Sequence, residues 1–190
     1  MPARGAGGGT PYDFYGIPLP EHRHANPLRL HWPCPGSIDG FLEFRKLSDW
    51  RQFVQSMNLS RSVPAIVAEK YRRAQKLYYL AWMEPDLFKV GELAALVALE
   101  NALRCKYEPK SSQSLAHLLK HMCEGDGLTD ELLPISRRCG APAIGQLTGA
   151  TRPTLAERRN ALAHGDAFDE LPVSGLLELV RDLVDYAYRT

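Results

Sequence analysis

The sequence lacks both a marked excess of charge of one sign and any long apolar run. Its 190 residues include 23 basic and 22 acidic ones, which gives a formal net charge of +1. A protein that coats nucleic acid without specificity is normally far more basic, so any contact with RNA should be confined to a pocket or a stripe. No apolar run approaches the ~20 residues of a membrane-spanning helix, and we expect no association with a membrane.

Cysteine is scarce, and no secretory signal precedes the four that are present. These are Cys34, Cys105, Cys123 and Cys139. Residues 1–10 are small and glycine-rich, without the apolar centre of a signal peptide. We therefore expect free thiols in a reducing compartment and predict a cytoplasmic protein.

Glycine and proline are concentrated near the beginning of the chain. Four glycines predict a flexible tail over residues 1–11. Five prolines between residues 12 and 40 forbid a long helix, which predicts an extended Pro-rich arm lying on a partner surface. Residues 41–54 fit either a short strand or a helix. Residues 12–60 are thus expected to hold this arm and short elements.

A helical period begins near Ser62 and continues to the end of the chain. Apolar residues recur there at three- and four-residue spacing, with Ser62 as the expected N-cap and Pro64 in the first turn. The expected helices cover about residues 62–81, 88–107, 114–124, 130–139, 153–164 and 174–188, and residues 141–152 are expected to be a loop. Five or six helices joined by short loops predict an all-α helical bundle over residues 61–190.

The fifth expected helix carries an arginine in the middle of its apolar face. At about 100° per residue, one arc is formed by Leu155, Ala156, Leu162 and Ala163, and Arg159 falls within it. A buried charge is costly unless it is paired or has a ligand. A helix that only packed against its neighbours would not place a guanidinium there, which makes Arg159 a candidate functional residue.

Asn160 and His164 flank this arc and share a face because they are four residues apart. His164 lies in the last turn, where the helix dipole favours imidazolium. Together with Arg159 they meet the needs of RNA cleavage by an internal 2′-hydroxyl. The histidine can move protons, and the guanidinium can bind the extra negative charge of the phosphorane. Such chemistry requires no metal ion and no cofactor.

The pattern Arg-Asn-three residues-His, followed by Gly, resembles the HEPN (higher eukaryotes and prokaryotes nucleotide-binding) domains. The segment Ala98–Arg104, which reads Ala-Leu-Glu-Asn-Ala-Leu-Arg, is similar to the second-helix segment of many HEPN proteins. The motif also precedes a final amphipathic helix, as it does in that family. The resemblance covers about residues 62–190, and the segment before them has no counterpart that we can name.

The resemblance implies a helical bundle that forms a homodimer, with a cleft where two copies of the motif meet. It implies metal-independent endoribonuclease activity, often within toxin–antitoxin or anti-phage defence systems, with RNA as substrate and an antitoxin or defence protein as a possible partner. Carried over by position, Arg159, Asn160 and His164 would be catalytic. A non-catalytic HEPN module that binds nucleotide, RNA or a partner protein is the alternative, and a regulatory subunit that uses its Pro-rich arm is a third.

Two further residues are expected to support this site. Glu100 lies mid-stripe on the second expected helix, and opposite charges on two apolar faces suggest a contact between Glu100 and Arg159. The contact could be a structural ion pair or could orient Arg159, and Arg104 is a rival partner four residues after Glu100. Arg158 points away from the apolar arc and is expected at the surface or in an interface.

The remaining candidates have simpler explanations. Lys70 and Arg73 make the polar side of the first helix basic, which could guide RNA toward a cleft or be a solvated face. His117 and His121 share a helix face, but no fourth ligand stands at a characteristic spacing, and no metal site is predicted. We expect four aromatic residues in the core or a dimer contact: Tyr71, Tyr78, Tyr79 and Trp82.

Overall fold

The protein is mostly helical. A computed structural model describes residues 14–23, 26–37, 39–107, 113–165 and 175–189. Within these ranges it contains eight α-helices, two short 3-10 helices and one two-stranded sheet. The predicted helical class is therefore correct in its main part, whereas the sheet was not predicted. The tail predicted over residues 1–11 lies outside the described residues.

The elements follow one another along the chain without an internal repeat. They are η1 (Phe14–Gly16), β1 (Leu28–His31), β2 (Phe41–Phe44), α1 (Leu47–Gln55), α2 (Ala65–Leu80), α3 (Leu87–Tyr107), α4 (Leu115–Glu124), η2 (Asp130–Leu132), α5 (Pro134–Cys139), α6 (Ile144–Thr148), α7 (Leu155–His164) and α8 (Leu176–Ala187). None of the described helices is both long enough and apolar enough to cross a membrane.

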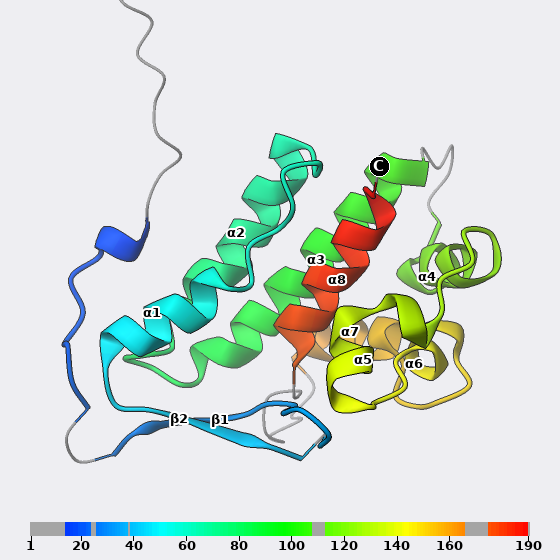
Figure 1. The fold of residues 1–190 in the computed structure, drawn as a ribbon. Helices are drawn as coiled ribbons and strands as arrows, with labels where there is room; N and C mark the ends of the chain where they lie inside the picture. Colours follow the sequence, from blue (N-terminus) through cyan, green and yellow to red (C-terminus); the bar gives the residue numbers. More distant parts are fainter. Residues whose placement is uncertain (1–13, 24–25, 38, 108–112, 166–174, 190) are drawn as a thin grey trace, which may run out of the picture.

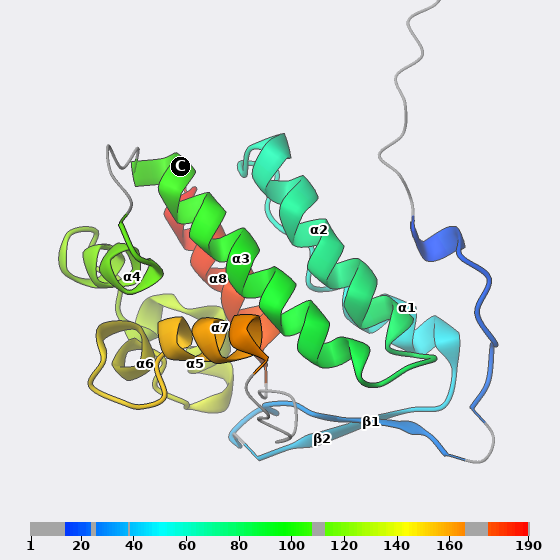
Figure 2. The ribbon, with the colours of Figure 1, turned by 180° about the vertical axis from the view of Figure 1, so that it is seen from behind.

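Helix α3 is the central element, with α2 along one side and α8 along another (Figure 1). Helices α4 to α7 gather on the side of α3 that lies away from α2, and α7 packs against α3 (Figure 2). The inner face of α3 suits this position because alanines alternate with leucines along it and let neighbouring helices approach closely. Its fully buried side chains include Ala95, Leu96, Ala98, Leu99, Ala102 and Leu103.

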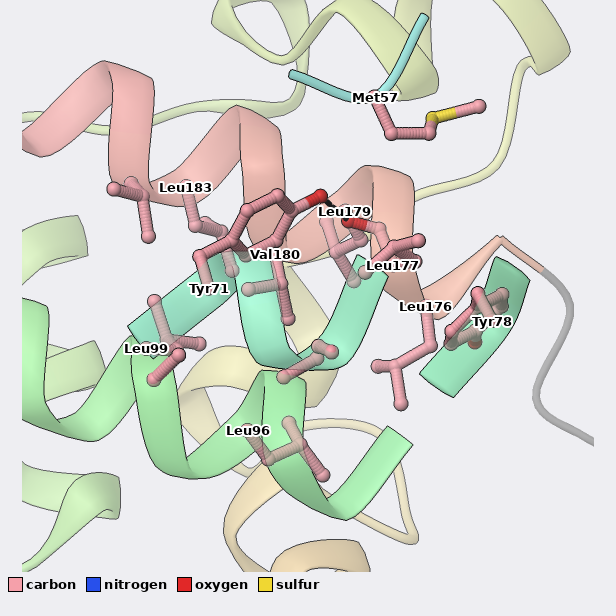
Figure 3. Packing of buried hydrophobic residues seen from close by; sticks show 14 of the residues in the cluster. Met57, Tyr71, Tyr78, Leu96, Leu99, Leu176, Leu177, Leu179, Val180 and Leu183 are labelled. Atoms are coloured by element: carbon pink, nitrogen blue, oxygen red, sulfur yellow. Dashed lines mark hydrogen bonds between the residues drawn. The ribbon is translucent and has the colours of Figure 1, made fainter. Parts of the chain in front are cut away.

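Buried apolar side chains fill the core between α2, α3 and α8 (Figure 3). Leu176, Leu177, Val180 and Leu183 of α8 are all buried there. The ring of Tyr71 on α2 is buried with them, and its hydroxyl donates a hydrogen bond of 3.0 Å to the carbonyl oxygen of Leu177. The four aromatic residues predicted to be core or dimer contacts are buried in the core: Tyr71, Tyr78, Tyr79 and Trp82.

The structure does not confirm an extended Pro-rich arm. Residues 28–31 form β1, which pairs antiparallel with β2 in a register that sets Leu28 opposite Phe44. The indole of Trp82, in the turn after α2, donates a hydrogen bond of 2.7 Å to the carbonyl oxygen of Pro20. The segment therefore folds onto its own chain, because its apolar residues find partners there that the proline pattern alone does not reveal.

Four predicted elements differ from the observed ones. The helix predicted over residues 130–139 is divided at Leu133 into η2 and α5. Residues 41–54 contain both a strand and a helix, β2 and α1, rather than one of the two. Helix α2 begins at Ala65 with Pro64 as its N-cap, so the predicted cap at Ser62 is wrong. The predicted loop 141–152 contains the short helix α6, whose first amides at Ala143 and Ile144 donate to the carboxylate of Asp130.

Candidate functional site

Helix α7 ends at Gly165 as predicted, and it begins at Leu155, two residues after the predicted start. The side chain of Thr154 accepts a hydrogen bond of 3.1 Å from the amide of Glu157, and the Glu157 carboxylate accepts one of 2.8 Å from the amide of Thr154. This capping box satisfies two amides that the first turn would otherwise leave free. At the other end Gly165 adopts φ +67°, a left-handed conformation that favours glycine and stops the helix.

The apolar face of α7 is narrower than the helical wheel suggested. Of the four residues on the predicted arc, Leu155 is buried, Ala156 and Leu162 are half-buried, and Ala163 is exposed. Arg159 therefore lies at the edge of the helix contact, and 33% of its side-chain surface remains exposed. A guanidinium in this position can be paired inside the protein and still be reached from solvent.

Arg159 is held by a carboxylate from α3. Its Nη2 donates a hydrogen bond of 2.7 Å to Oε2 of Glu100, whose residue is only 6% exposed. Its Nη1 donates one of 3.0 Å to Oδ1 of the adjacent Asn160, while its Nε is buried without a partner among the described residues. The contact with Glu100 that the two helical wheels suggested is therefore present.

Glu100 binds a second arginine at the same time. Oε1 of Glu100 accepts a hydrogen bond of 2.6 Å from Nη2 of Arg104, one turn later on α3. Arg104 and Arg159 are therefore not rivals for this carboxylate, because each occupies one of its two oxygens. Two guanidinium groups on one carboxylate leave this cluster with one net positive charge.

His164 stands apart from this cluster. It occupies the last turn of α7, where both it and Asn160 are exposed. Across the described parts of the chain, no hydrogen bond joins the imidazole to Arg159 or to Asn160. A single chain therefore brings Arg159, Asn160 and Glu100 together but leaves His164 open to solvent.

The supporting residues are distributed over three helices. Arg158 is half-buried on α7, and its Nε is shielded from solvent without a partner in the described ranges. Lys70 on α2 donates a hydrogen bond of 3.2 Å to Oδ1 of Asn101 on α3, and Arg73 is exposed. Lys70 thus links the two helices, and Arg73 is the freer of the two basic residues.

The histidines of α4 and the thiols have local surroundings of their own. The ring of His121 meets the ring of Tyr107 edge to face, with 4.7 Å between the centroids. Burial, followed by the charges of Asp130 and Glu124, raises the pKa of the Cys123 thiol to about 11. The described residues include no group of three or more side chains suited to a metal ion, and the four cysteines are free thiols.

A hollow of about 500 Å³ lies between the C-terminal half of α8 and residues 126–134, and nothing in the sequence reveals it. Asp126, Asp182 and Asp185 contribute acidic groups to its wall, together with Arg189. These residues come from separate turns of α8 and from the loop after α4, and their spacing along the chain carries no recognisable motif. The hollow is lined by none of the residues predicted for the site on α7.

Comparison of this chain with protein-family models, with curated proteins and with solved structures gives no match. The chemistry of the α7 residues must therefore be interpreted from their own geometry. That geometry comprises a paired arginine, a neighbouring amide and an exposed histidine on one helix.

Proposed function

We propose that the protein is a metal-independent endoribonuclease of the HEPN type, with Arg159, Asn160 and His164 as its catalytic residues. The observation that carries this proposal is the position of Arg159. It is fixed on α7 by Glu100 at 2.7 Å and bonded to Asn160 at 3.0 Å, yet a third of its side chain is open to solvent. A guanidinium so oriented is suited to bind the oxygens of a phosphodiester.

The proposed reaction is an internal transesterification. The 2′-hydroxyl attacks the adjacent phosphorus, a bond from phosphorus to the 2′-oxygen forms, and the bond to the 5′-oxygen breaks. One histidine takes the proton of the attacking hydroxyl or supplies one to the leaving 5′-oxygen. Arg159 neutralises the charge that grows on the phosphorane, and Asn160 positions the guanidinium through Oδ1. The products are a 2′,3′-cyclic phosphate and a 5′-hydroxyl.

The active form is proposed to be a homodimer with a composite cleft. His164 is exposed at the end of α7 and does not contact Arg159 within the described chain. A second copy facing α7 would supply another His164 and another Arg159 to one cleft, so that one histidine could act as base and the other as acid. Arg158 would lie in this interface, and Arg73 with Lys70 would guide RNA along α2.

The cellular role that accompanies this activity is that of a toxin or an anti-phage effector in the cytoplasm. The resemblance to HEPN domains supports this role, with RNA as substrate and an antitoxin or another defence protein as partner. The near-neutral net charge of +1 favours a local RNA contact over general coating of nucleic acid.

A second candidate function is a non-catalytic module that binds RNA or nucleotide, or that only dimerises. One observation favours it: both terminal nitrogens of Arg159 already donate to protein acceptors, Glu100 and Asn160. An arginine satisfied in this way is also typical of a structural ion pair.

The test is RNA cleavage in the presence of EDTA by the full chain and two histidine variants. His164→Ala removes the proposed proton-transfer group, whereas His117→Ala removes an exposed histidine on α4 and is the matched control. We expect His164→Ala to lower the cleavage rate by about 10²-fold or more and His117→Ala to leave it unchanged. Products of the active protein should end in a 2′,3′-cyclic phosphate.

Cleavage that is equal in all three proteins would point to a contaminating nuclease and would overturn the catalytic assignment. RNA binding without cleavage by the wild type would support the binding module instead. Sedimentation at two protein concentrations checks the homodimer independently of activity, because a monomer at the concentration of the assay would contradict the composite cleft.

A further inference from the structure

The cluster around Glu100 contains one more cation than its carboxylate requires. Arg159 alone would neutralise this buried group, yet Arg104 binds its other oxygen at 2.6 Å. Forty-five per cent of the Arg104 side chain is exposed, so the second guanidinium is the more accessible of the two. The excess charge of the cluster is therefore presented to solvent on Arg104.

Arg104 also retains unused hydrogen-bond donors. Its Nη2 donates to Glu100 and, at 3.2 Å, to the carbonyl oxygen of Gln113 just before α4. In the ranges that the structure describes, its Nη1 and Nε meet no acceptor. A guanidinium has five N–H donors in a rigid fork that matches a phosphate, and here one end of the fork is anchored and the other is open.

We propose that Arg104 is a second phosphate-binding residue of the α7 site and contacts the backbone of the same RNA strand that Arg159 binds. Glu100 holds both guanidinium groups, one on each carboxylate oxygen, so that they bind the strand as a fixed pair. This proposal rests on the proposed function and adds a residue of α3 to a site otherwise carried by α7.

Because Glu100 anchors both side chains, the two arginines can bind one strand with little further loss of side-chain entropy. A free arginine loses much side-chain entropy when it is fixed by a ligand. The Oε1 and Oε2 contacts fix Arg104 and Arg159 before RNA arrives. Phosphate contacts of this kind set the register of the strand and carry no base specificity.

The experiment measures the salt dependence of RNA binding. A fully 2′-O-methylated oligonucleotide lacks the attacking hydroxyl, so its dissociation constant can be followed by fluorescence anisotropy over a range of salt concentrations without cleavage. The proteins are the wild type, Arg104→Gln, Arg104→Lys and the control Arg137→Gln. Arg137 is exposed on α5, so Arg137→Gln removes the same charge outside the cluster.

We expect Arg104→Gln to weaken the binding of all sequences alike. The logarithm of the association constant falls with the logarithm of the salt concentration, and the steepness of this slope should decrease by about 0.7, the value for one phosphate contact on a single strand. Arg104→Lys should keep the slope, because the charge remains, but bind less tightly, because the fork is lost. Arg137→Gln should match the wild type. With a cleavable RNA, Arg104→Gln should raise KM and leave kcat nearly unchanged.

A merely structural role for Arg104 predicts a different result. If Arg104 acted only by holding Glu100, Arg104→Gln would lower kcat through Arg159 and leave the salt slope at the wild-type value, which would overturn the proposal. A slope that falls equally in Arg137→Gln would also overturn it, because the effect would then be one of overall charge. Thermal unfolding of each variant identifies any loss of the fold.

The two proposals fail in distinguishable ways. Cleavage that depends on His164, together with an unchanged salt slope in Arg104→Gln, would overturn the proposed role of Arg104 and support the nuclease assignment. A less steep salt slope in Arg104→Gln, without RNA cleavage by the wild type, would support Arg104 as a phosphate ligand and overturn the nuclease assignment. A wild type that fails to bind the oligonucleotide at low salt would overturn the role of Arg104 directly.

Discussion

At the scale of the residue, Glu100 determines the geometry of the candidate site. The carboxylate is 6% exposed, and burial of a charge is costly unless both of its oxygens are satisfied. Arg104 and Arg159 provide this satisfaction from two different helices. Glu100 therefore joins α3 to α7 and orients Arg159 with a single side chain.

Glu100→Gln should destabilise the protein by about 1–3 kcal/mol, since it removes the charge that two guanidinium groups share and sets an amide donor against one of them. The estimate lies below that for a fully buried pair because Arg104 and Arg159 are partly exposed. Urea unfolding measures the loss. The control is Glu43→Gln, whose carboxylate pairs with Arg29 and Arg45 at the surface and should change stability by less than about 1 kcal/mol. A loss no larger than that of the control would contradict the anchoring role of Glu100.

Part of this arrangement could be predicted from the sequence. Helical wheels give directions around an axis, and they placed Arg159 and Glu100 on faces that meet. They do not give the depth of packing, so Ala163 was expected in the apolar arc and is exposed. Nor could they show that Glu100 would bind Arg104 as well as Arg159, because the rotamers of long side chains depend on the packed helices around them.

At the scale of the element, the end of α7 has a local signal in Gly165 and was predicted, whereas the start of α6 has a distant signal and was not. The bounds of α7 follow from Thr154, Glu157 and Gly165, all of which act within one turn of the helix ends. Helix α6 receives its cap from Asp130, more than ten residues earlier in the chain. No window of the sequence around residues 144–148 contains that signal.

The β1–β2 hairpin depends on a similar long-range contact. The indole of Trp32 donates a hydrogen bond of 3.0 Å to the carboxylate of Glu178 on α8. Arg138 of α5 binds the same carboxylate and also donates to the carbonyl oxygen of Pro33. The prolines of this segment correctly exclude a long helix, but its attachment to α5 and α8 depends on residues more than 100 positions away.

The capping box of α7 gives a second stability prediction. Thr154→Ala removes the acceptor for the amide of Glu157 and should lower the free energy of unfolding by about 1 kcal/mol. The amide of Thr154 holds the pKa of the Glu157 carboxyl below its ordinary value, with Arg152 assisting. Ionised Glu157 therefore contributes to the free energy of unfolding. This contribution is fully present above the pKa that Glu157 has in the unfolded chain, and it is lost as the pH falls through the lowered pKa of the folded state.

Denaturant unfolding at several pH values measures both effects. Ser114→Ala at the N-cap of α4 is a matched control for the loss of a cap, since the Ser114 hydroxyl accepts from His117 without a reciprocal carboxylate. The stability lost in Ser114→Ala should therefore not depend on the ionisation of a neighbouring carboxylate. If Thr154→Ala left the free energy of unfolding unchanged, the capping box would not hold the first turn of α7.

At the scale of the whole molecule, the early segment and the helices share one core. Phe14, Leu30 and Trp32 are buried in the same apolar cluster as residues of α3 and α8. The change of hydrophobic period near Ser62 separates the hairpin and α1 from the longer helices that follow, and periodicity reports which face of an element is buried. It does not report what covers that face, so packing across this boundary could not be predicted from the sequence.

Asp185 joins α8 to the segment before α2. Its Oδ1 accepts a hydrogen bond of 2.8 Å from the amide of Ser60. Burial raises its pKa above the ordinary value, and the charge of Asp182 adds to this, while the Ser60 amide and Arg181 oppose it. The folded protein thus binds this proton more tightly than the unfolded chain, whose aspartates titrate near pH 3.9. Ionised Asp185 therefore costs stability, and the cost is present above its folded pKa and disappears as the pH falls toward the unfolded value.

Asp185→Asn should raise the free energy of unfolding at pH 7, because the amide oxygen keeps the bond from Ser60 while the unfavourable charge is removed. The gain should be below about 1 kcal/mol, since the group is half-exposed and solvent screens it. Urea unfolding between pH 3 and pH 7 should show the difference from the wild type shrinking toward acid. Asp39→Asn, at an exposed position of the hairpin, is the control and should show no such pH-dependent gain. A gain that is absent at pH 7, or that grows as the pH falls, would mean that Asp185 is stabilised in its ionised form and that the Ser60 amide and Arg181 outweigh its burial.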